Sequence, residues 1–306
     1  MFFEQFDQYM SDLSKFFRTK RNNYETAALF DQLARTQDSS NPFECALAGL
    51  AKFGELQCYL KIEDKSRTVQ AAIHAARLFI KNAKYGYDYS RIVKETWSIS
   101  LADGLHCYRV AIDVLKTISK HYLTSIVLIE MGKVEMSFDF PHHAGNTFEE
   151  AVGIIIEGQV PLPVLFDSVL NTVQAYTRVD RFDLALNVVE KAHSHFFDNE
   201  TMWVSPSPIM KKQYRDILIY QAQLLIMVFR YEDCLKFVSQ NHDTEIAELF
   251  RRMVEASKNY QIFVIDSIIQ KALQSKQFNA QQIALFNRHL ALISKNVEAG
   301  VFQVMS

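Results

Sequence analysis

The chain has 306 residues, enough for one long repeat array or two modest domains, and 49% of them are apolar, which is ample for a core. Only 9 glycines and 6 prolines are present, and such a scarcity of turn-forming residues disfavours a β-sandwich and fits long helices. The formal net charge of −2 argues against nucleic-acid binding by phosphate neutralisation and against attachment to a membrane surface through basic charge.

The cysteines and the opening residues give expectations about the compartment. The cysteines are scattered without a CxxC pair, so buried thiols are expected rather than disulfides or a zinc site; they are Cys45, Cys58, Cys107 and Cys234. The stretch MFFEQFDQYM carries Glu4 and Asp7 and has no basic segment, unlike a signal peptide. The most apolar helix, 216–229, is too short to span a membrane. We therefore expect a cytoplasmic protein without direct membrane insertion.

The first half of the chain predicts amphipathic helices in succession. Residues 2–19 place large apolar side chains on one side, and the basic run 18–21 is expected to end this helix. Asn22 or Asn23 is expected to cap the next helix. An interruption at 141–146 separates this half from a short helix, 148–157, which Thr147 is expected to cap. Between these segments, helices are predicted at 43–60, 66–83 and 93–138, the last with a break near Lys120.

Residues 175–192 carry the clearest architectural signal. Tyr176 closes the apolar face of one helix, Asp180 is expected to cap a second, and the small Ala185 lies on the inner face of that second helix. A small side chain lets neighbouring helices approach closely, and the large side chains around it fill the flanks. This pattern is typical of a tetratricopeptide-type unit, whose period is about 34 residues; an ordinary helical hairpin is the alternative.

The small position of Ala185 recurs at irregular spacing, which indicates a degenerate repeat. The candidates are Ala27, Ala71, Ala151 and Cys234. The predicted fold is all-α: a tetratricopeptide-like, right-handed α-solenoid of antiparallel helix pairs. The polar stretch 198–208 is expected to divide an N-terminal lobe, 1–197, from a C-terminal lobe, 209–296, that continues the solenoid. A tail, 297–306, follows.

The helices predicted beyond this break lie at 209–229, 232–241, 245–258, 261–274 and 280–295. Within the first of them, residues 217–229 are apolar almost all round, so the helix must be covered on several sides. Either a flanking helix of this chain covers it, or another protein does.

Motifs that would indicate chemistry are absent from the sequence. It contains no phosphate-binding loop, dinucleotide fingerprint, HExxH, nucleophile elbow or EF-hand. His193 and His195 are two positions apart on a predicted helix, so they point to different faces and do not chelate one metal readily. The adjacent Glu149 and Glu150 diverge for the same reason. We expect a protein that is not an enzyme, with no catalytic residue, cofactor or metal.

Four stretches resemble one known family in the same order along the chain. The segment at 6–34 (FDQYMSDLSKFFRTKRNNYETAALFDQLA) resembles the opening of the 40-kDa huntingtin-associated protein family, also called the factor VIII intron 22 protein family. HAARLFI at 74–80, EGQVPLPVLF at 157–166 and FNAQQIALF at 278–286 match in kind and order, so the resemblance covers most of 1–296. The chain lacks the family's Gly/Ala-rich N-terminal extension and its long proline-rich insertion.

The resemblance implies a helical solenoid without enzymatic activity that forms a stable complex with huntingtin, itself a giant helical-repeat protein. It also implies a link to early endosomes through a Rab GTPase. A nuclear pool of the protein is compatible with the resemblance. The family motifs assign no individual contact residue to this chain. From the sequence, we predict that partner contacts come from apolar groups beside the breaks or at the end of the chain: Trp203, Phe229, Tyr231 and Phe302. Simple core packing is the alternative for each.

Two other functions stay open at this point. A soluble NSF-attachment-protein-like adaptor would also be a neutral, cytosolic, helical-repeat protein of similar length, and binding to a SNARE bundle would select it. A catalytic helical protein, such as a terpenoid or lipid enzyme, would need paired acidic motifs facing a pocket.

Overall fold

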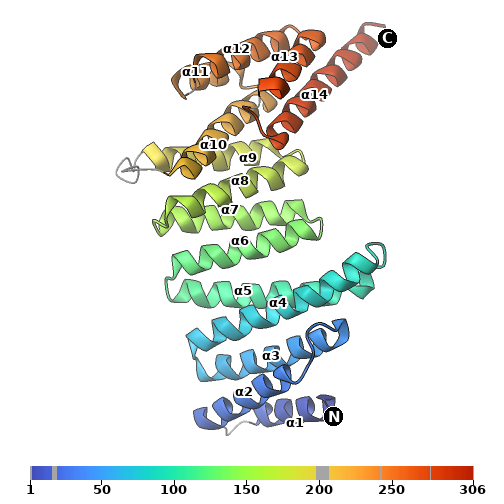
Figure 1. Cartoon of the computed structure of the whole chain (residues 1–306), viewed down its shortest axis with the longest axis vertical. Coiled ribbons are helices and arrows are strands. Elements are labelled where there is room, and N and C mark those ends of the chain that lie inside the picture. Colours follow the sequence, from blue (N-terminus) through green and yellow to red (C-terminus); the bar gives the residue numbers. More distant parts are fainter. Residues whose placement is uncertain (1, 16–18, 198–206, 242, 276, 306) are drawn as a thin grey trace. The chain divides into compact units, whose positions relative to one another are not determined.

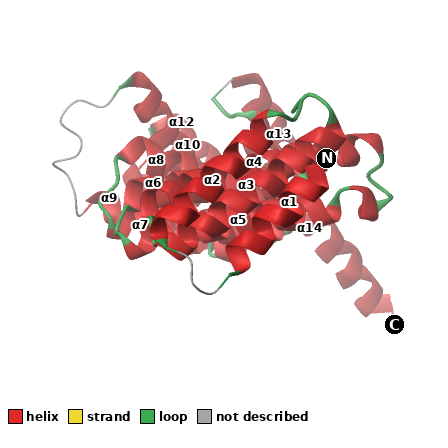
Figure 2. Ribbon diagram, turned by 90° about the horizontal axis from the view of Figure 1, so that it is seen from below, coloured by secondary structure: helices red, strands yellow, loops and turns green. Residues whose placement is uncertain are grey.

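The computed structural model describes residues 2–15, 19–197, 207–241, 243–275 and 277–305. These residues form fourteen α-helices and one 3₁₀ turn, and no strand occurs among them (Figure 1, Figure 2). The all-α prediction is confirmed. The chain packs as two compact units, Met1–Phe140 and Pro141–Ser306.

The first unit is a stack of helices in chain order, each packed beside its predecessor (Figure 1). A break at residues 118–120 separates α5 from α6, where the sequence predicted one near Lys120. The elements are α1 (Phe2–Ser14), α2 (Lys20–Arg35), α3 (Pro42–Ile62), α4 (Lys65–Tyr89), η1 (Lys94–Thr96), α5 (Ser98–Thr117) and α6 (His121–Ser137).

The second unit has the same solenoid-like build, in which most contacts join helices that are neighbours along the chain. Its α10 makes additional contacts with α8 and α14. The elements are α7 (Pro141–Glu157), α8 (Leu162–Arg178), α9 (Phe182–Phe197), α10 (Pro208–Met227), α11 (Tyr231–Asn241), α12 (Thr244–Lys258), α13 (Ile262–Ser275) and α14 (Ala280–Met305).

Seven of the turns between successive helices share one geometry. Each places a residue other than glycine in the left-handed region, with φ between 48° and 63°: Glu63, Ser119, Asp139, Gln159, Asp180, Phe229 and Tyr260. The N–H of the following residue then donates to the carbonyl four residues before the left-handed one, as in Arg181 N to Tyr176 O at 3.0 Å around Asp180. This pattern satisfies the last carbonyls of a helix while the chain reverses. Asp180, which the sequence assigned to a helix cap, is therefore the turn residue itself.

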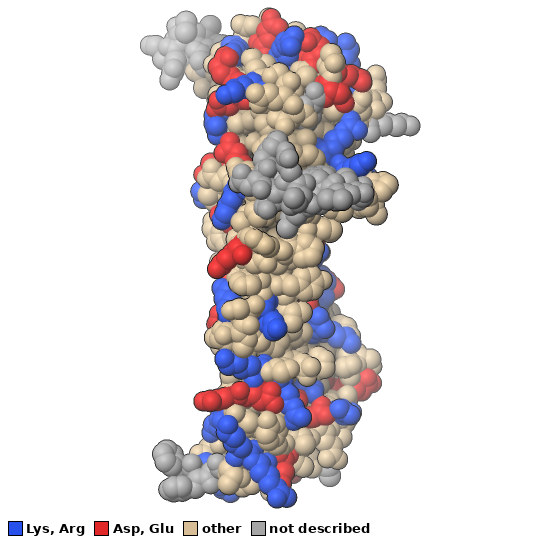
Figure 3. All heavy atoms as spheres, turned by 90° about the vertical axis from the view of Figure 1, so that its left-hand side faces the viewer, with Lys and Arg blue, Asp and Glu red and all other residues tan. Residues whose placement is uncertain are grey.

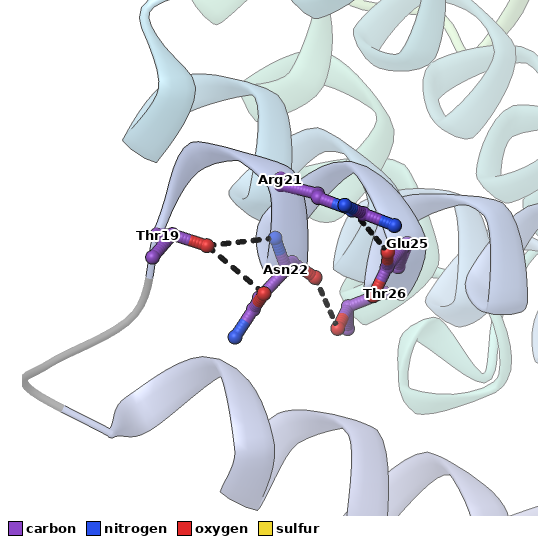
Figure 4. Close-up of polar contacts among 5 residues, drawn as sticks. All are labelled: Thr19, Arg21, Asn22, Glu25 and Thr26. Carbon is purple, nitrogen blue, oxygen red and sulfur yellow. Dashed lines mark hydrogen bonds and ion pairs between the residues drawn. The ribbon is translucent and has the colours of Figure 1, made fainter.

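The first interhelical junction differs from the sequence prediction. Lys20 and Arg21 begin α2, whereas the basic run was expected to end the first helix. The N-cap is Thr19 and not Asn22 or Asn23, because its hydroxyl accepts a 3.3 Å hydrogen bond from the Asn22 N–H (Figure 4). Arg21 instead pairs with Glu25 one turn further along α2, at 3.1 Å.

Three boundaries fall elsewhere than the sequence placed them. Helix α7 begins at Pro141, so the expected interruption at 141–146 is its first turns, since proline is tolerated where an N–H has no helical partner. Compact packing divides at Phe140 and not at 198–208, because the helices on both sides of that stretch share one core. Residues 198–206 themselves lie outside the described part of the chain. Helix α14 continues through most of the expected tail.

The all-round apolar helix is covered by its own chain. Every residue of α10 from Ile217 to Met227 is buried, and the helices around it are α8, α9, α11 and α14. Of the two explanations left open for this helix, the flanking helices therefore hold. Phe229, just beyond its end, is the exception, with 48% of its surface exposed.

Where two helices come close together, large aromatic rings of one helix pack against small residues of the other. Ala185 is fully buried, as the sequence pattern required. A Cβ placed on Gly54 would lie 2.6 Å from the ring of Phe30, and one placed on Gly145 would lie 2.5 Å from the ring of Tyr176. The Tyr176 hydroxyl donates to the Glu149 carboxylate and lies 3.0 Å from Asn146 Oδ1, and these contacts hold the ring in place. Aromatic side chains thus pack against small residues in both units.

Replacing either of two glycines of α7 by alanine should change the free energy of unfolding, but in opposite directions. Gly145→Ala forces a methyl group into the fixed Tyr176 ring, and we expect the free energy of unfolding to fall by about 2 kcal/mol. Gly153 has open space around it, so Gly153→Ala should raise this free energy by about 1 kcal/mol through helix propensity. Urea denaturation of both variants measures the difference. Equal effects would contradict the close approach at Gly145.

Candidate interaction surface

The structure brings together two of the four predicted contact residues. Phe229 occupies the turn between α10 and α11, and Tyr231 is the first residue of α11; their ring centroids are 6.0 Å apart at 89°. Tyr231 is half-buried. Trp203 lies outside the described residues. Phe302 falls within α14, but its side chain lies outside the described part.

The turn between α12 and α13 repeats the arrangement at α10–α11. Tyr260 corresponds to Phe229, with φ of 52° against 60°, and 56% of its surface is exposed. Phe263, in the first turn of α13, is 91% exposed. We refer to Phe229, Tyr231, Tyr260 and Phe263 as the aromatic edge.

Neighbouring contacts show that the two turns lie side by side. Lys258, at the end of α12, forms an ion pair with Glu232, at the start of α11. Burial raises the pKa of the Tyr231 hydroxyl, and the nearby Tyr260 hydroxyl adds to this shift. Phe229, Tyr231 and Tyr260 therefore lie at one edge of the second unit, and Phe263 follows Tyr260 in the first turn of α13.

Ion pairs connect this edge to α9. Arg230 donates to Asp233 in α11 at 2.7 Å and to Glu190 in α9 at 2.9 Å. Together with the Lys258–Glu232 pair, these contacts pair charged residues at and beside the two turns. The aromatic edge thus presents apolar ring surface framed by paired charges, which is the composition of an interface centre and its rim.

Two residues of the edge hold a backbone conformation that suits them poorly. The other five left-handed turn positions carry polar residues, whereas Phe229 and Tyr260 are bulky aromatics, for which this region costs about 1–2 kcal/mol. Both are about half exposed, so core packing does not explain why an aromatic residue is there. Backbone strain of this kind clusters at functional sites.

Tyr260 and Phe263 were not among the contact residues predicted from the sequence, although a repeated sequence pattern marks Tyr260. The sequence Phe229-Arg230-Tyr231 at one turn matches Tyr260-Gln261-Ile262 at the other: an aromatic residue, a polar residue and an apolar residue that opens the next helix. Aligning the two turns in one repeat phase would have placed Tyr260 beside Phe229.

The buried thiols offer no reactive nucleophile. All four cysteines are free and buried, and burial raises the pKa of Cys107 and of Cys234 to about 12. A thiol with such a pKa is protonated at neutral pH. These cysteines behave as small core residues.

The described ranges contain neither a cluster of metal-ligating side chains nor a membrane-spanning helix. No group of three or more His, Cys, Asp or Glu side chains is placed to hold a metal ion in the part of the chain that the structure describes. Among the described helices, none is both long and apolar enough to cross a membrane.

Acidic and basic side chains lie interspersed on the face seen in Figure 3, with wide areas of neither kind between them. This distribution agrees with a formal net charge near zero.

No protein-family model matches the chain, and no curated protein matches it either.

Proposed function

We propose that this chain is a non-catalytic protein-interaction subunit, resembling the 40-kDa huntingtin-associated protein, that binds and stabilises huntingtin in a lasting complex. The observation that supports an interaction role most directly is the aromatic edge. Large, half-exposed rings framed by paired charges are the residues that contribute most to binding when a partner buries them. The identity of the partner follows from the resemblance of four sequence stretches.

The proposal includes the finer architecture and the cellular setting. We propose that the helices form antiparallel pairs of the tetratricopeptide type that wind to the right. A cytoplasmic location is expected, with an early-endosomal association through a Rab GTPase. The repeated left-handed turn at seven junctions supports a repeat of this kind.

Affinity purification of the tagged full chain from cells, followed by washing in high salt, tests the partner. An apolar interface survives such a wash, whereas a contact made only of exposed charges is screened. Retention of huntingtin supports the proposal. Retention of a SNARE bundle without huntingtin would instead select the NSF-attachment-protein-like adaptor.

The double variant Phe229→Gly/Tyr260→Gly should separate binding from stability. Glycine relieves the left-handed backbone, so we expect the free energy of unfolding to rise by about 1 kcal/mol. Loss of the two rings should weaken capture of the partner by about 2 kcal/mol, or about thirtyfold. Thermal denaturation and quantitative pull-down measure the two effects.

Gln159→Gly is the matched control, because Gln159 is an exposed, left-handed turn residue of the same unit without an aromatic ring. It should be stabilised like the double variant but should keep full partner capture. If the double variant captured the partner as well as the unchanged chain, the aromatic edge would not be the binding surface.

A further inference from the structure

A row of basic and polar side chains runs along one face of α4 in the first unit. Arg67, His74, Arg77, Lys81 and Lys84 follow one another three, four or seven positions apart, which places them on one side of a helix. We refer to these five residues as the α4 basic stripe. It extends over about 26 Å at the helical rise per residue.

The stripe borders two hollows that meet at Arg77. One, of about 590 Å³, lies between α2, α3 and α4, and the other, of about 450 Å³, lies between α4, α5 and α6. Arg77 lines both of them. The two hollows therefore adjoin at Arg77, and α4 lines both of them.

Three of the four acidic residues lie at the floor of the two hollows, whereas the basic residues of the stripe lie at the rim; the fourth acidic residue, Asp88, is also at the rim, 57% exposed and paired with Lys84 at 3.1 Å. The side chains of Asp31, Glu55 and Glu130 are 27%, 11% and 29% exposed, whereas those of Arg67 and Arg77 are 54% and 57% exposed. Between Arg67 and Lys81, a molecule that approaches from solvent therefore meets the cations first. Six basic and four acidic residues line the two hollows, so this region is positive in a chain of net charge −2.

Contacts beneath the rim hold three of the cations in place. Arg77 donates to both oxygens of Glu130, at 2.7 and 2.8 Å, and Glu130 also accepts from the hydroxyl of the buried Tyr108. The Arg67 guanidinium lies over the rings of Tyr24 and Tyr59, at 5.1 and 5.7 Å. Lys84 lies over Tyr87 and Phe138 in the same way.

This support leaves donors available to a ligand. Arg77 uses two of its nitrogens on Glu130, and a guanidinium carries five N–H donors in all. None of the ion pairs among the described residues includes Lys81, which is exposed and lies between Arg77 and Lys84 in the stripe. Cations that are already ordered lose little side-chain freedom when an anion binds.

We propose that the α4 basic stripe binds an acidic peptide segment of a partner protein, laid along α4 across both hollows. About eight extended residues match the length of the stripe. Carboxylates spaced along a peptide can meet the rim cations one by one while avoiding the floor acids. A nucleic-acid backbone fits poorly, because its closely spaced phosphates would also face Asp31, Glu55 and Glu130.

Fluorescence anisotropy with labelled octaglutamate as the probe tests this proposal on the full chain, carried on a soluble fusion partner. We expect binding at low ionic strength that weakens as salt is added. Lys81→Glu should weaken this binding by about tenfold or more. Lys65→Glu is the matched control: it makes the same charge change on an exposed lysine of the same helix, outside the stripe, and should leave the affinity unchanged.

Several outcomes would overturn the proposal. They are the absence of octaglutamate binding to the unchanged chain, equal loss in Lys65→Glu, equal binding of octaglutamine, and tighter binding of an oligodeoxythymidylate of the same charge. Circular dichroism verifies that Lys81→Glu is folded. Phe229→Gly/Tyr260→Gly should bind octaglutamate normally, so a failure here is distinguishable from a failure of the aromatic edge.

Discussion

Replacing Lys52 by methionine is expected to lower the free energy of unfolding by about 3 kcal/mol, the largest effect of any single substitution considered for this chain. The Lys52 ammonium lies in a hydrogen-bonded group with Asp31 and with Glu55, the latter at 2.7 Å. Its side chain is only 12% exposed and that of Glu55 only 11%. Methionine keeps the length of the side chain but leaves the poorly hydrated Glu55 carboxylate without its cation and leaves Asp31 with Arg35 alone.

The pKa values of Asp31 and Lys52 also indicate that the carboxylates and the Lys52 ammonium stabilise one another. Burial alone would raise the pKa of Asp31, but hydrogen bonds and charge from Lys52 and Arg35 outweigh it and lower the pKa below its usual value. Burial alone would lower the pKa of Lys52, but the two carboxylates raise it. The stabilisation is therefore fully present between these two titrations; it is lost as the pH falls through the lowered pKa of Asp31 or rises through the raised pKa of Lys52.

A compensated variant provides the control for Lys52. Lys52→Met combined with Asp31→Asn and Glu55→Gln removes all three charges, so no carboxylate is left unpaired. We expect this triple variant to recover most of the stability lost in Lys52→Met. Urea denaturation at neutral pH measures both, and a single variant as stable as the unchanged chain would show that solvent, rather than Lys52, compensates the two acids.

Acidification from pH 6.5 to pH 4 should remove about 3 kcal/mol of stability through His289 alone. This side chain, in α14, is 1% exposed, and burial lowers its pKa to about 4. The unfolded chain takes up a proton near the ordinary pKa of 6.5, whereas the folded chain does not until about pH 4. Stability is therefore complete above pH 6.5 and falls as the pH decreases below it.

Hydrogen bonding explains why the folded state resists this proton. The Ser257 hydroxyl donates to the Met253 carbonyl at 2.7 Å, so its oxygen is left to accept from His289 Nε2–H, also at 2.7 Å. The proton of the neutral ring is then on Nε2. His289 Nδ1 is buried and has no hydrogen-bond partner among the described residues. A second proton there would place a charge in the core without an acceptor.

His289→Gln tests this account, because a glutamine amide can still donate to Ser257 but does not titrate. The variant should lose less stability than the unchanged chain between pH 6.5 and pH 4, by about 3 kcal/mol, when both are unfolded in urea at a series of pH values. Burial also lowers the pKa of His193, and that contribution is common to both proteins and cancels. Parallel pH profiles would rule out His289 as the sensor.

Local patterns in the sequence were sufficient to predict most of the helices. Apolar spacing predicted the successive helices of both units, and the small Ala185 among large neighbours predicted a close helix contact, because both signals depend on residues only a few positions apart. Helix starts were less predictable: Thr19 rather than Asn22 caps α2, since several adjacent polar residues can each accept the same N–H.

The sequence by itself thus determined that the chain is all-α, that its helices pair through small residues, and that Phe229 and Tyr231 adjoin a break. Only the tertiary structure decided which apolar groups are covered. The same periodicity describes the buried Ile217 and the exposed Phe229, and their difference depends on helices distant in the chain, such as α14. Likewise, the spacing of the α4 basic stripe is visible in the sequence, but the support of Arg77 by Glu130 joins residues 53 positions apart. Contacts of that separation follow from the packing of whole helices, which no local pattern specifies.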